Sequence, residues 1–280
     1  QPTSLLLEAL SQGGYLRRSG DIYRLAPQAK KWLVKSSPHY IGNFIAYLEI
    51  LHSHWGYLES TIRNGKPPST YFETFTENEW AVYTAGMNDL AKLIIPHVLP
   101  KIAIPPKAVS LLDVGGSHGL YSIKLVEKHP NLHAVIADVP EVLVHTKKNI
   151  SDANLGSRIS VQPCEVTTTE FPKNSYDVIL LFNLIHGLTE DANRNLLHTL
   201  VKSLKDGGTI YILDQFKTDK QSGMKSFLPL MVGLNLLNET GGRVYSVDEV
   251  NGWCAAEGLR NISFRKLRLP GVGLMRLLAS

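Results

Sequence analysis

The sequence predicts an α/β protein in which a mainly parallel sheet, covered by helices, follows a mostly helical N-terminal region. From about residue 108 onward, short apolar runs alternate with segments of helical periodicity, as expected for strands that are buried on both faces. Before that point, apolar residues recur every three or four positions. The 280 residues, 44% of them apolar, suffice for one large domain or two modest ones. We place the boundary after residue 103, which gives domains 1–103 and 104–280.

Residues 4–34 show the outline of a winged helix: a helix, two short strands and a second helix. Two glycines at 13–14 end the first helix, residues 19–21 (Ser-Gly-Asp) supply the turn between the strands, and Pro27 suits the first turn of the next helix. The chain begins within an apolar helical pattern. We therefore expect that further residues precede Gln1 in the complete protein.

Two amphipathic helices are predicted between residues 40 and 103, on either side of the polar stretch RNGKPPST. Helices of this kind bury their apolar stripe against a partner, in the same chain or in a second subunit. Three prolines then interrupt the helical period, at Pro100, Pro105 and Pro106.

The second part should contain five strands with helices between them. We expect strands at 109–114, 132–137, 159–162, 177–183 and 209–213. The clearest helix is 190–205, with Thr189 as its N-cap and Gly207 as the left-handed residue that ends it.

Bulk properties exclude several classes. The formal net charge of +4 comes from scattered lysines and arginines, which is too weak a pattern to indicate nucleic-acid binding. The longest apolar stretches fall short of the roughly 20 residues needed to cross a bilayer, so no membrane segment is expected. The two cysteines, Cys164 and Cys254, lack metal-ligand spacing, and the residues from Gln1 onward do not resemble a signal sequence. We expect a cytoplasmic protein without a bound metal.

The segment SLLDVGGSHGLYSIKLVEKHPNLHAVIADVP carries the most chemical information. It reads as a strand, a glycine turn, a helix and a second strand that ends at Asp138. Gly115, Gly116 and Gly119 allow a tight turn that exposes backbone amides near a helix N-terminus, and Asp138 can accept both hydroxyls of a ribose. A cofactor that contains adenosine is implied, although the same glycines could serve only a tight strand-to-helix turn.

The glycine spacing differs from that of dinucleotide-binding proteins. Ser117 and Leu120 stand where the second and third glycines of G-x-G-x-x-G should be, which disfavours an NAD-dependent oxidoreductase. Asp113 precedes the turn and would repel a pyrophosphate, but it suits a cofactor with a positively charged sulfur and amino group. S-adenosylmethionine is therefore favoured over NAD.

The motifs DVGGSHG, ADVP, LLFNLIHGLTED, LKDGGTIYILD and NETGGRVYS resemble those of S-adenosylmethionine-dependent O-methyltransferases of plant caffeic acid and bacterial secondary-metabolite type. The resemblance covers nearly the whole chain. It implies a Rossmann-like class I methyltransferase domain with a seven-stranded sheet whose last strand is antiparallel, closed by a hairpin from 261–267 and 272–278. It also implies a winged-helix N-terminal domain that forms a homodimer.

The resemblance also assigns site residues. Gly115 and Asp138 match the cofactor-binding glycine and ribose-binding acid, and Glu165 and Val166 fall at the adenine-side pair. Phe182 stands where plant enzymes have a lysine on the cofactor side. The predicted cofactor site comprises Asp113, Gly115, Gly116, Gly119, Asp138, Val139, Glu165, Val166 and Phe182.

His186 matches the general base of this family, and Asp214 matches the position of the acid that orients it. A histidine suits this role because its ordinary pKa of about 6.5 leaves it largely neutral at physiological pH. Besides Phe182, two features depart from the plant pattern: Gly187-Leu188 replaces Asp-Trp, and Val244 stands where plant enzymes have a second acidic partner of the base. The strength of the base is therefore open.

The acceptor is expected to be a small aromatic or secondary-metabolite molecule. The resemblance places Met87 in its pocket, and Met231, Asn235 and Asn238 lie on a helix that would face it. Methylation of carbon or nitrogen, or a reaction without methyl transfer, remains an alternative on the same scaffold. From another class, the alternative is a nucleoside-sensing winged-helix regulator of transcription, suggested by RRSG at the wing and by Lys30-Lys31.

Overall fold

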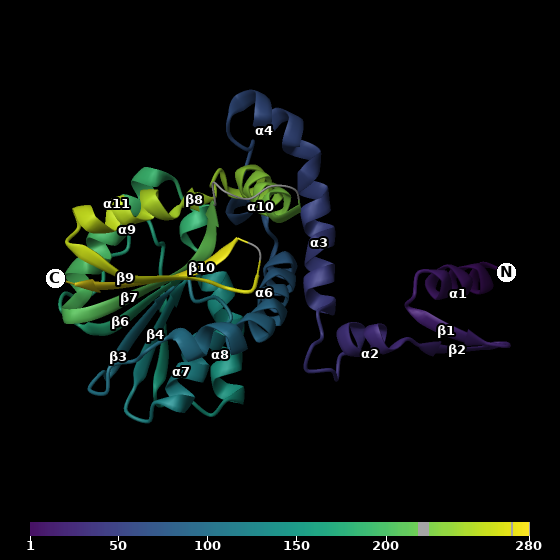
Figure 1. The fold of residues 1–280 in the computed structure, drawn as a ribbon, viewed down its shortest axis with the longest axis horizontal. Helices are drawn as coiled ribbons and strands as arrows, with labels where there is room; N and C mark the ends of the chain where they lie inside the picture. Colours follow the sequence, from purple (N-terminus) through teal and green to yellow (C-terminus); the bar gives the residue numbers. More distant parts are fainter. Residues whose placement is uncertain (218–223, 270, 280) are drawn as a thin grey trace.

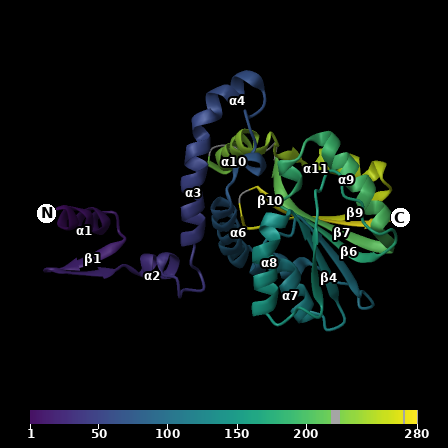
Figure 2. The same ribbon diagram turned by 180° about the vertical axis from the view of Figure 1, so that it is seen from behind.

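The computed structural model describes residues 1–217, 224–269 and 271–279. Figures 1 and 2 show the N-terminal elements standing apart from the body of the molecule, in the order predicted for a winged helix. These elements are α1 (Pro2–Gln12), β1 (Leu16–Ser19), β2 (Ile22–Leu25) and α2 (Pro27–Leu33). None of the residues of α1 is buried within this chain.

A helical region joins these elements to the sheet. Its elements are α3 (Gly42–His54), η1 (Trp55–Tyr57), α4 (Leu58–Asn64), α5 (Tyr71–Thr74), α6 (Glu77–Val98) and η2 (Leu99–Lys101). The Thr76 side chain caps α6 by accepting the Glu79 amide, and the Glu79 carboxylate accepts the Thr76 amide in return. Helix α6 packs against α3 on one side and against α7 and α8 on the other. It therefore ties the helical region to the sheet.

The sheet has the strand order β5-β4-β3-β6-β7-β10-β9, and β8 pairs with β7 outside this path. Its strands are β3 (Ser110–Val114), β4 (His133–Asp138), β5 (Ile159–Pro163), β6 (Tyr176–Phe182), β7 (Leu204–Lys217), β8 (Tyr245–Ser246), β9 (Leu259–Lys266) and β10 (Val272–Ala279). The strands from β3 to β7 pair in parallel, whereas β10 runs antiparallel to both of its neighbours. The α/β architecture and the closing hairpin are confirmed.

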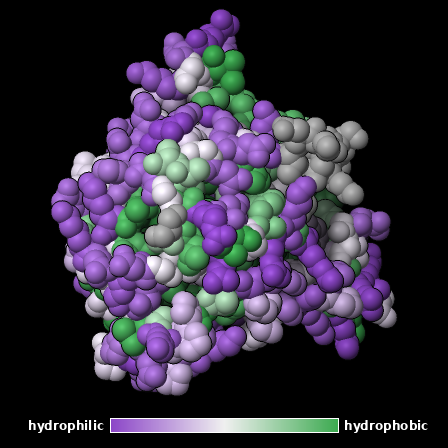
Figure 3. Space-filling model, turned by 60° about the vertical axis from the view of Figure 1, so that its left-hand side comes forward, coloured by the Kyte–Doolittle hydropathy of each residue, from purple (hydrophilic) through white to green (hydrophobic). Residues whose placement is uncertain are grey.

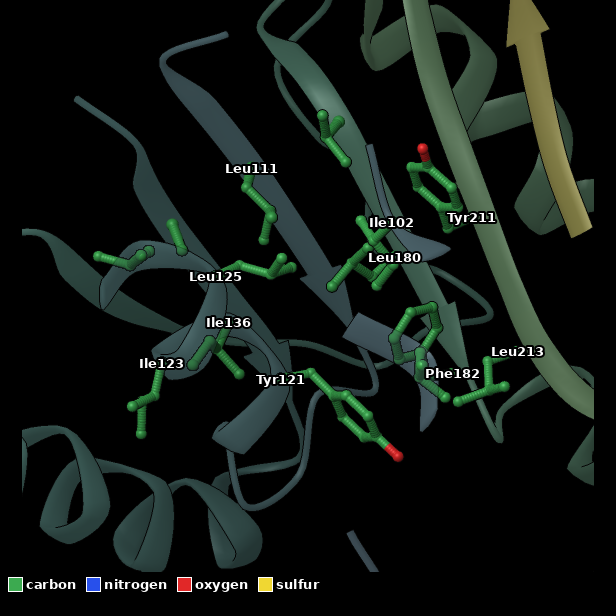
Figure 4. Packing of buried hydrophobic residues seen from close by; sticks show 14 of the residues in the cluster. Ile102, Leu111, Tyr121, Ile123, Leu125, Ile136, Leu180, Phe182, Tyr211 and Leu213 are labelled. Carbon is green, nitrogen blue, oxygen red and sulfur yellow. The ribbon is translucent and has the colours of Figure 1, made fainter. Parts of the chain in front are cut away.

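Helices cover both faces of the sheet (Figure 1). They are α7 (Leu120–Lys128) and α8 (Pro140–Asp152) on one face, α9 (Glu190–Ser203) and α11 (Val247–Ala256) on the other, and α10 (Met224–Thr240) beside α3. Alternate residues of each strand supply the two cores: Leu111 and Leu180 on the α7 side, Leu112 and Leu181 on the α9 side. Figure 4 shows the first of these cores. Complete burial of such a leucine stabilises the fold by about 1.5–3 kcal/mol.

The helix predicted for 190–205 begins as expected but ends earlier. Thr189 accepts the amide of Ala192 at the N-terminus, and the helix stops at Ser203. Gly207 is left-handed, with φ of 69°, but it lies within β7, where the pairing with β6 shifts register. Its left-handed conformation therefore serves an irregularity of the strand and does not end the helix.

None of the helices that the structure describes combines the length and hydrophobicity needed to span a bilayer. On the face shown in Figure 3, hydrophilic residues predominate and hydrophobic residues form smaller patches. The strands from β3 to β7, being parallel, all end at the same edge of the sheet. That edge is where ligands bind in open α/β sheets.

Candidate active site

A cavity of about 540 Å³ lies at the carboxyl ends of the parallel strands. Segments that follow β3, β4, β5 and β6 form one wall, and side chains of α3, α6 and α10 form the other. The cavity therefore joins the glycine turn, which we call the cofactor side, to the helical region, which we call the acceptor side.

The glycine turn brings its backbone to the cavity at Gly115, which has a φ of 68°. The other two glycines lie behind the turn, and their part in cofactor binding stays a prediction. A Cβ on Gly116 would come within 2.7 Å of Ile136 and 2.8 Å of Asp113, and Gly119 is the left-handed N-cap of α7. These two glycines let the turn pack closely against β4.

Asp138 lies on the cavity wall and holds the turn in place. One carboxylate oxygen accepts the Ser117 amide at 2.8 Å, and the other accepts the Val139 amide at 2.7 Å. Burial raises the pKa of Asp138 to about 6, against the lowering effect of these two hydrogen bonds. Each oxygen keeps a lone pair that a ligand hydroxyl can use.

Asp113 is not among the residues that line the cavity, and its part in cofactor binding stays a prediction. It shares the strand face of Leu111, so its side chain points beneath the turn, where Oδ2 accepts the Ser122 hydroxyl at 2.6 Å. Burial raises its pKa to about 7, the Ser122 hydrogen bond lowers it, and the charge of Asp138 raises it.

The Ser117 hydroxyl, on the cavity wall, is buried and has no hydrogen-bond partner among the described residues. Buried polar groups are normally satisfied, so this hydroxyl indicates a polar ligand group that completes the site. Together with the Asp138 carboxylate, it fits a ligand that carries hydroxyls and a positive charge. The residues therefore fit S-adenosylmethionine.

Val139, Glu165 and Val166 also lie on the wall of the cofactor side. Phe182 is not among the residues that line the cavity, and its part in cofactor binding stays a prediction. Its ring is buried and meets the ring of Tyr121 edge-on, with centroids 4.9 Å apart (Figure 4). The side chain lies on the face of β6 that packs under α7, where it belongs to the core.

His186 lies on η3 (Ile185–Gly187), directly after β6, and reaches the cavity. Its Nδ1 lies 2.5 Å from Asp214 Oδ1, and the His186 amide donates to Asp214 Oδ2 at 3.4 Å. The Asp214 side chain is fully buried, whereas 18% of the His186 side chain stays exposed. An ionised Asp214 holds the proton on Nδ1, which leaves Nε2 free to accept one.

The pKa of His186 is raised above its ordinary value. Burial acts to lower it, but the charge and hydrogen bond of Asp214, with a contribution from Glu239, outweigh burial. The predicted pairing of His186 with Asp214 is thus present in the structure. Its geometry is that of an oriented base.

On the acceptor side, the structure brings Met87 and Asn235 to the cavity but not Met231 or Asn238. Asn238 is buried between helices, where Oδ1 accepts the Thr61 hydroxyl at 2.7 Å and Nδ2 donates to the His54 carbonyl at 2.8 Å. Its polar groups therefore hold α10 against the helical region. The place of Met231 and Asn238 in the acceptor pocket stays a prediction.

Sequence reasoning missed several residues of the acceptor side. Tyr47 and Tyr83, whose rings meet edge-on at 5.3 Å, line the cavity together with Phe44 and Trp80. The buried acid Glu239 lies there as well. Its signal was present in the sequence, because Glu239 is an acid near the end of the long apolar stretch MVGLNLLNET. Within the described residues, no group of three or more histidine, cysteine or acidic side chains could hold a metal ion.

Residues 55–260 match the O-methyltransferase domain family. The chain is 25% identical over 278 residues to 3-hydroxy-5-methyl-1-naphthoate 3-O-methyltransferase of Streptomyces sahachiroi, covering 97% of this chain and 79% of that protein. It is 29% identical over 166 residues to L-tyrosine C(3)-methyltransferase of Streptomyces lavendulae, covering 58% of this chain and 44% of that protein.

Human N-acetylserotonin methyltransferase, solved in complex with S-adenosylmethionine, superposes with a TM-score of 0.85 at 20% identity, covering 100% of this chain and 83% of that chain. At this identity the likeness shows the fold. The family match, in contrast, spans most of the chain, and it decides for an enzyme over a DNA-binding regulator or a nicotinamide oxidoreductase. The protein therefore belongs to the O-methyltransferase family and is an S-adenosylmethionine-dependent methyltransferase of small metabolites.

Proposed function

We propose that the protein transfers a methyl group to a hydroxyl of an aromatic acceptor, with His186 as the general base and Asp214 as the residue that positions it. The observation that carries this proposal is the His186–Asp214 pair at the junction of the two sides of the cavity. A base at this point can contact a group held between the aromatic wall and the glycine turn.

The cofactor side has the residues to hold S-adenosylmethionine. Asp138 would accept the ribose hydroxyls, Gly115 would let the ligand approach the backbone, and Glu165 with Val166 would border the adenine. When bound, the cofactor supplies a methyl group on a positively charged sulfur.

The acceptor side holds and activates the other reactant. The rings of Tyr47, Tyr83 and Trp80, in which Tyr83 meets each of the other two edge-on, provide an apolar wall suited to an aromatic acceptor. His186 then takes the proton of the acceptor hydroxyl on Nε2, while Asp214 stabilises the imidazolium that forms. Positioning can supply roughly 7–11 kcal/mol of the barrier, and a placed base adds on the order of 10² to 10⁴ in rate.

The relatives support an aromatic acceptor without fixing the atom that is methylated. One is named for methylating the oxygen of a naphthoate and another for methylating a carbon of tyrosine. We favour a hydroxyl because its methylation requires loss of a proton, which the oriented His186 can accept.

A transfer assay with a labelled methyl donor and a panel of hydroxylated aromatic acceptors tests this function. We expect labelled products from at least one phenol, and loss of most of this transfer in His186→Ala. Transfer that is undiminished in His186→Ala would remove the histidine from the mechanism.

We further propose that the protein is a homodimer built through its N-terminal elements. Helix α1 and the β1–β2 hairpin stand away from the body and expose large apolar side chains, among them Leu5, Leu6 and Ile22, at 70%, 58% and 58%. A second copy would remove these side chains from water. Light scattering of the wild type and of a Leu5→Glu/Leu6→Glu variant should show a dimer and a weakened dimer, respectively.

A further inference from the structure

The acceptor side of the cavity contains a buried acid that forms no salt bridge among the described residues. Glu239, at the end of α10, is 5% exposed. Its Oε2 accepts the Asn235 amide at 2.8 Å, and its Oε1 accepts the Tyr47 hydroxyl at 3.4 Å. The described residues give it neutral donors, and no lysine or arginine among them forms a salt bridge with it.

Glu239 is held in a fixed position by a chain of side chains. The Trp55 indole donates to Asn235 Oδ1 at 2.8 Å, and this bond turns the Asn235 amide nitrogen toward Glu239. Tyr47 approaches the carboxylate from α3. The carboxylate is therefore oriented by groups from three elements, as expected of a binding group whose geometry matters.

Apart from His186, the charged side chains that line the cavity are all acidic. Four carboxylates line it, those of Glu73, Asp138, Glu165 and Glu239, and no lysine or arginine is among its described lining residues. Asp138 and Glu165 belong to the cofactor side, whereas Glu239 lies among the aromatic rings of the acceptor side. A negatively charged acceptor would meet repulsion there, and a positively charged one would meet attraction.

We infer that Glu239 selects the acceptor, and that it does so by binding a protonated amine carried on the aromatic skeleton that presents its hydroxyl to His186. The aromatic rings around the acid suit such a group, since cations are attracted to ring faces. This inference rests on the proposed function of the same cavity, and it names the substrate class: hydroxylated aromatic amines, with aromatic carboxylates excluded.

Burial raises the pKa of Glu239 to about 7, against the lowering effects of the Tyr47 and Asn235 hydrogen bonds and of the His186 charge. Tyr47 from α3, Asn235 from α10 and His186 from η3 are the groups that face it. Near neutral pH, Glu239 is therefore protonated for part of the time when no acceptor is bound. An amine that stays protonated should bind more tightly as pH rises through 7. Above this pH Glu239 is already ionised and does not have to lose a proton when the amine binds.

Three catechols with similar skeletons provide the test: dopamine, its neutral analogue hydroxytyrosol, and the carboxylate 3,4-dihydroxyphenylacetate. Their affinities are measured by calorimetry in the presence of S-adenosylhomocysteine, so that the result does not depend on methyl transfer. We expect dopamine to bind most tightly and the carboxylate at least tenfold more weakly.

Glu239→Gln keeps the shape of the side chain and removes its charge. It should weaken dopamine binding roughly 30-fold or more, which is the usual consequence of removing one partner of a buried ion pair. The affinities for hydroxytyrosol and S-adenosylhomocysteine should stay nearly unchanged. Glu59→Gln, which breaks only an exposed ion pair with Arg63 on α4, is the matched control and should leave all three affinities unchanged.

Dopamine that binds no more tightly than the carboxylate, or that is unaffected by Glu239→Gln, overturns the inference. Methyl transfer is measured separately on the same samples. Transfer to the carboxylate but not to dopamine would overturn this selectivity and leave the proposed oxygen methylation standing. Dopamine binding that depends on Glu239, without methylation of any hydroxyl, would sustain the selectivity and remove the proposed reaction.

Discussion

The two sides of the cavity are built in different ways. The core of the cofactor side comes from one continuous segment, in which β3, the glycine turn, α7 and β4 bring residues 110–139 together. The acceptor side is assembled from α3, α6, η3 and α10, whose residues lie far apart in the sequence. A local motif determines the first, whereas the packing of distant helices determines the second.

The two sides also differ in how their polar groups are satisfied. On the cofactor side, the Ser117 hydroxyl is buried without a partner among the described residues, and the Asp138 carboxylate lies on the cavity wall. On the acceptor side, Trp55, Asn235 and Tyr47 complete hydrogen bonds that end at Glu239. The cofactor side thus leaves polar atoms for a ligand, and the acceptor side offers a ligand one oriented charge.

Substitution of His186 should distinguish the roles of the two sides most strongly. We expect His186→Ala to lower kcat by about 10²- to 10⁴-fold, because it removes proton transfer. Affinity for S-adenosylhomocysteine, measured by calorimetry, should stay nearly unchanged, since His186 belongs to the acceptor side. An equal loss of cofactor affinity would show that the two sides do not act separately.

The pH dependence of kcat/KM should report the environment of His186. The base must be neutral to act, and its pKa is raised, so activity should increase with pH along a limb centred above about 6.5, the ordinary value for histidine. In Asp214→Asn, the effect of burial then dominates the pKa of His186 and lowers it, so the rising limb of the pH profile should move to lower pH. The plateau should also fall, because an amide does not hold the proton on Nδ1 in the same way. An unmoved limb would contradict the assignment of Asp214.

On the cofactor side, Asp138→Ala should weaken the binding of S-adenosylhomocysteine about 10- to 100-fold. The variant loses one or two hydrogen bonds to a charged group, and each contributes about 1.5 kcal/mol. Affinity in the wild type should fall as pH drops through 6, where the carboxylate gains a proton. Asp152→Ala, which removes an exposed ion pair with Lys148 on α8, is the control. Equal affinities of the two variants would exclude Asp138 from the site.

The smallest expected effect is on stability. In Gly116→Ala the new Cβ would lie 2.7 Å from Ile136 and must displace it, which should cost about 1–3 kcal/mol in the free energy of unfolding. A Cβ on Gly156 meets no atom within 4 Å, so Gly156→Ala should unfold at nearly the wild-type denaturant concentration. Equal midpoints of denaturant unfolding for the two variants would show that the glycine turn tolerates a Cβ at position 116.

The sequence predicted the elements of the sheet well because their signals are local. The positions of Gly115, Asp138 and His186 follow from where strands end. The direction of side chains was less predictable: Asp113 and Phe182 lie on the expected strands, but strand alternation turns both toward the core under α7. Nothing in the strand pattern identifies which face carries the ligand.

Helix α10 shows a second limit. Asn235 reaches the cavity, whereas Asn238, one turn later, is used to bind the His54 carbonyl and the Thr61 hydroxyl. Residues at this spacing share a helix face, so periodicity cannot separate them. Only the packing of α10 against α3 and α4 decides which of them meets a ligand, and the same packing made Glu239 part of the site.

The most direct test of the proposed reaction follows the methyl group itself. A donor labelled with ¹³C in its methyl group is incubated with the enzyme and a hydroxylated aromatic acceptor, and the carbon NMR shift of the product identifies the atom that received the label. We predict a methyl group on oxygen, formed at a greatly reduced rate by His186→Ala. A label on carbon or nitrogen, or an unchanged rate in His186→Ala, would contradict the proposal that the His186–Asp214 pair activates a hydroxyl.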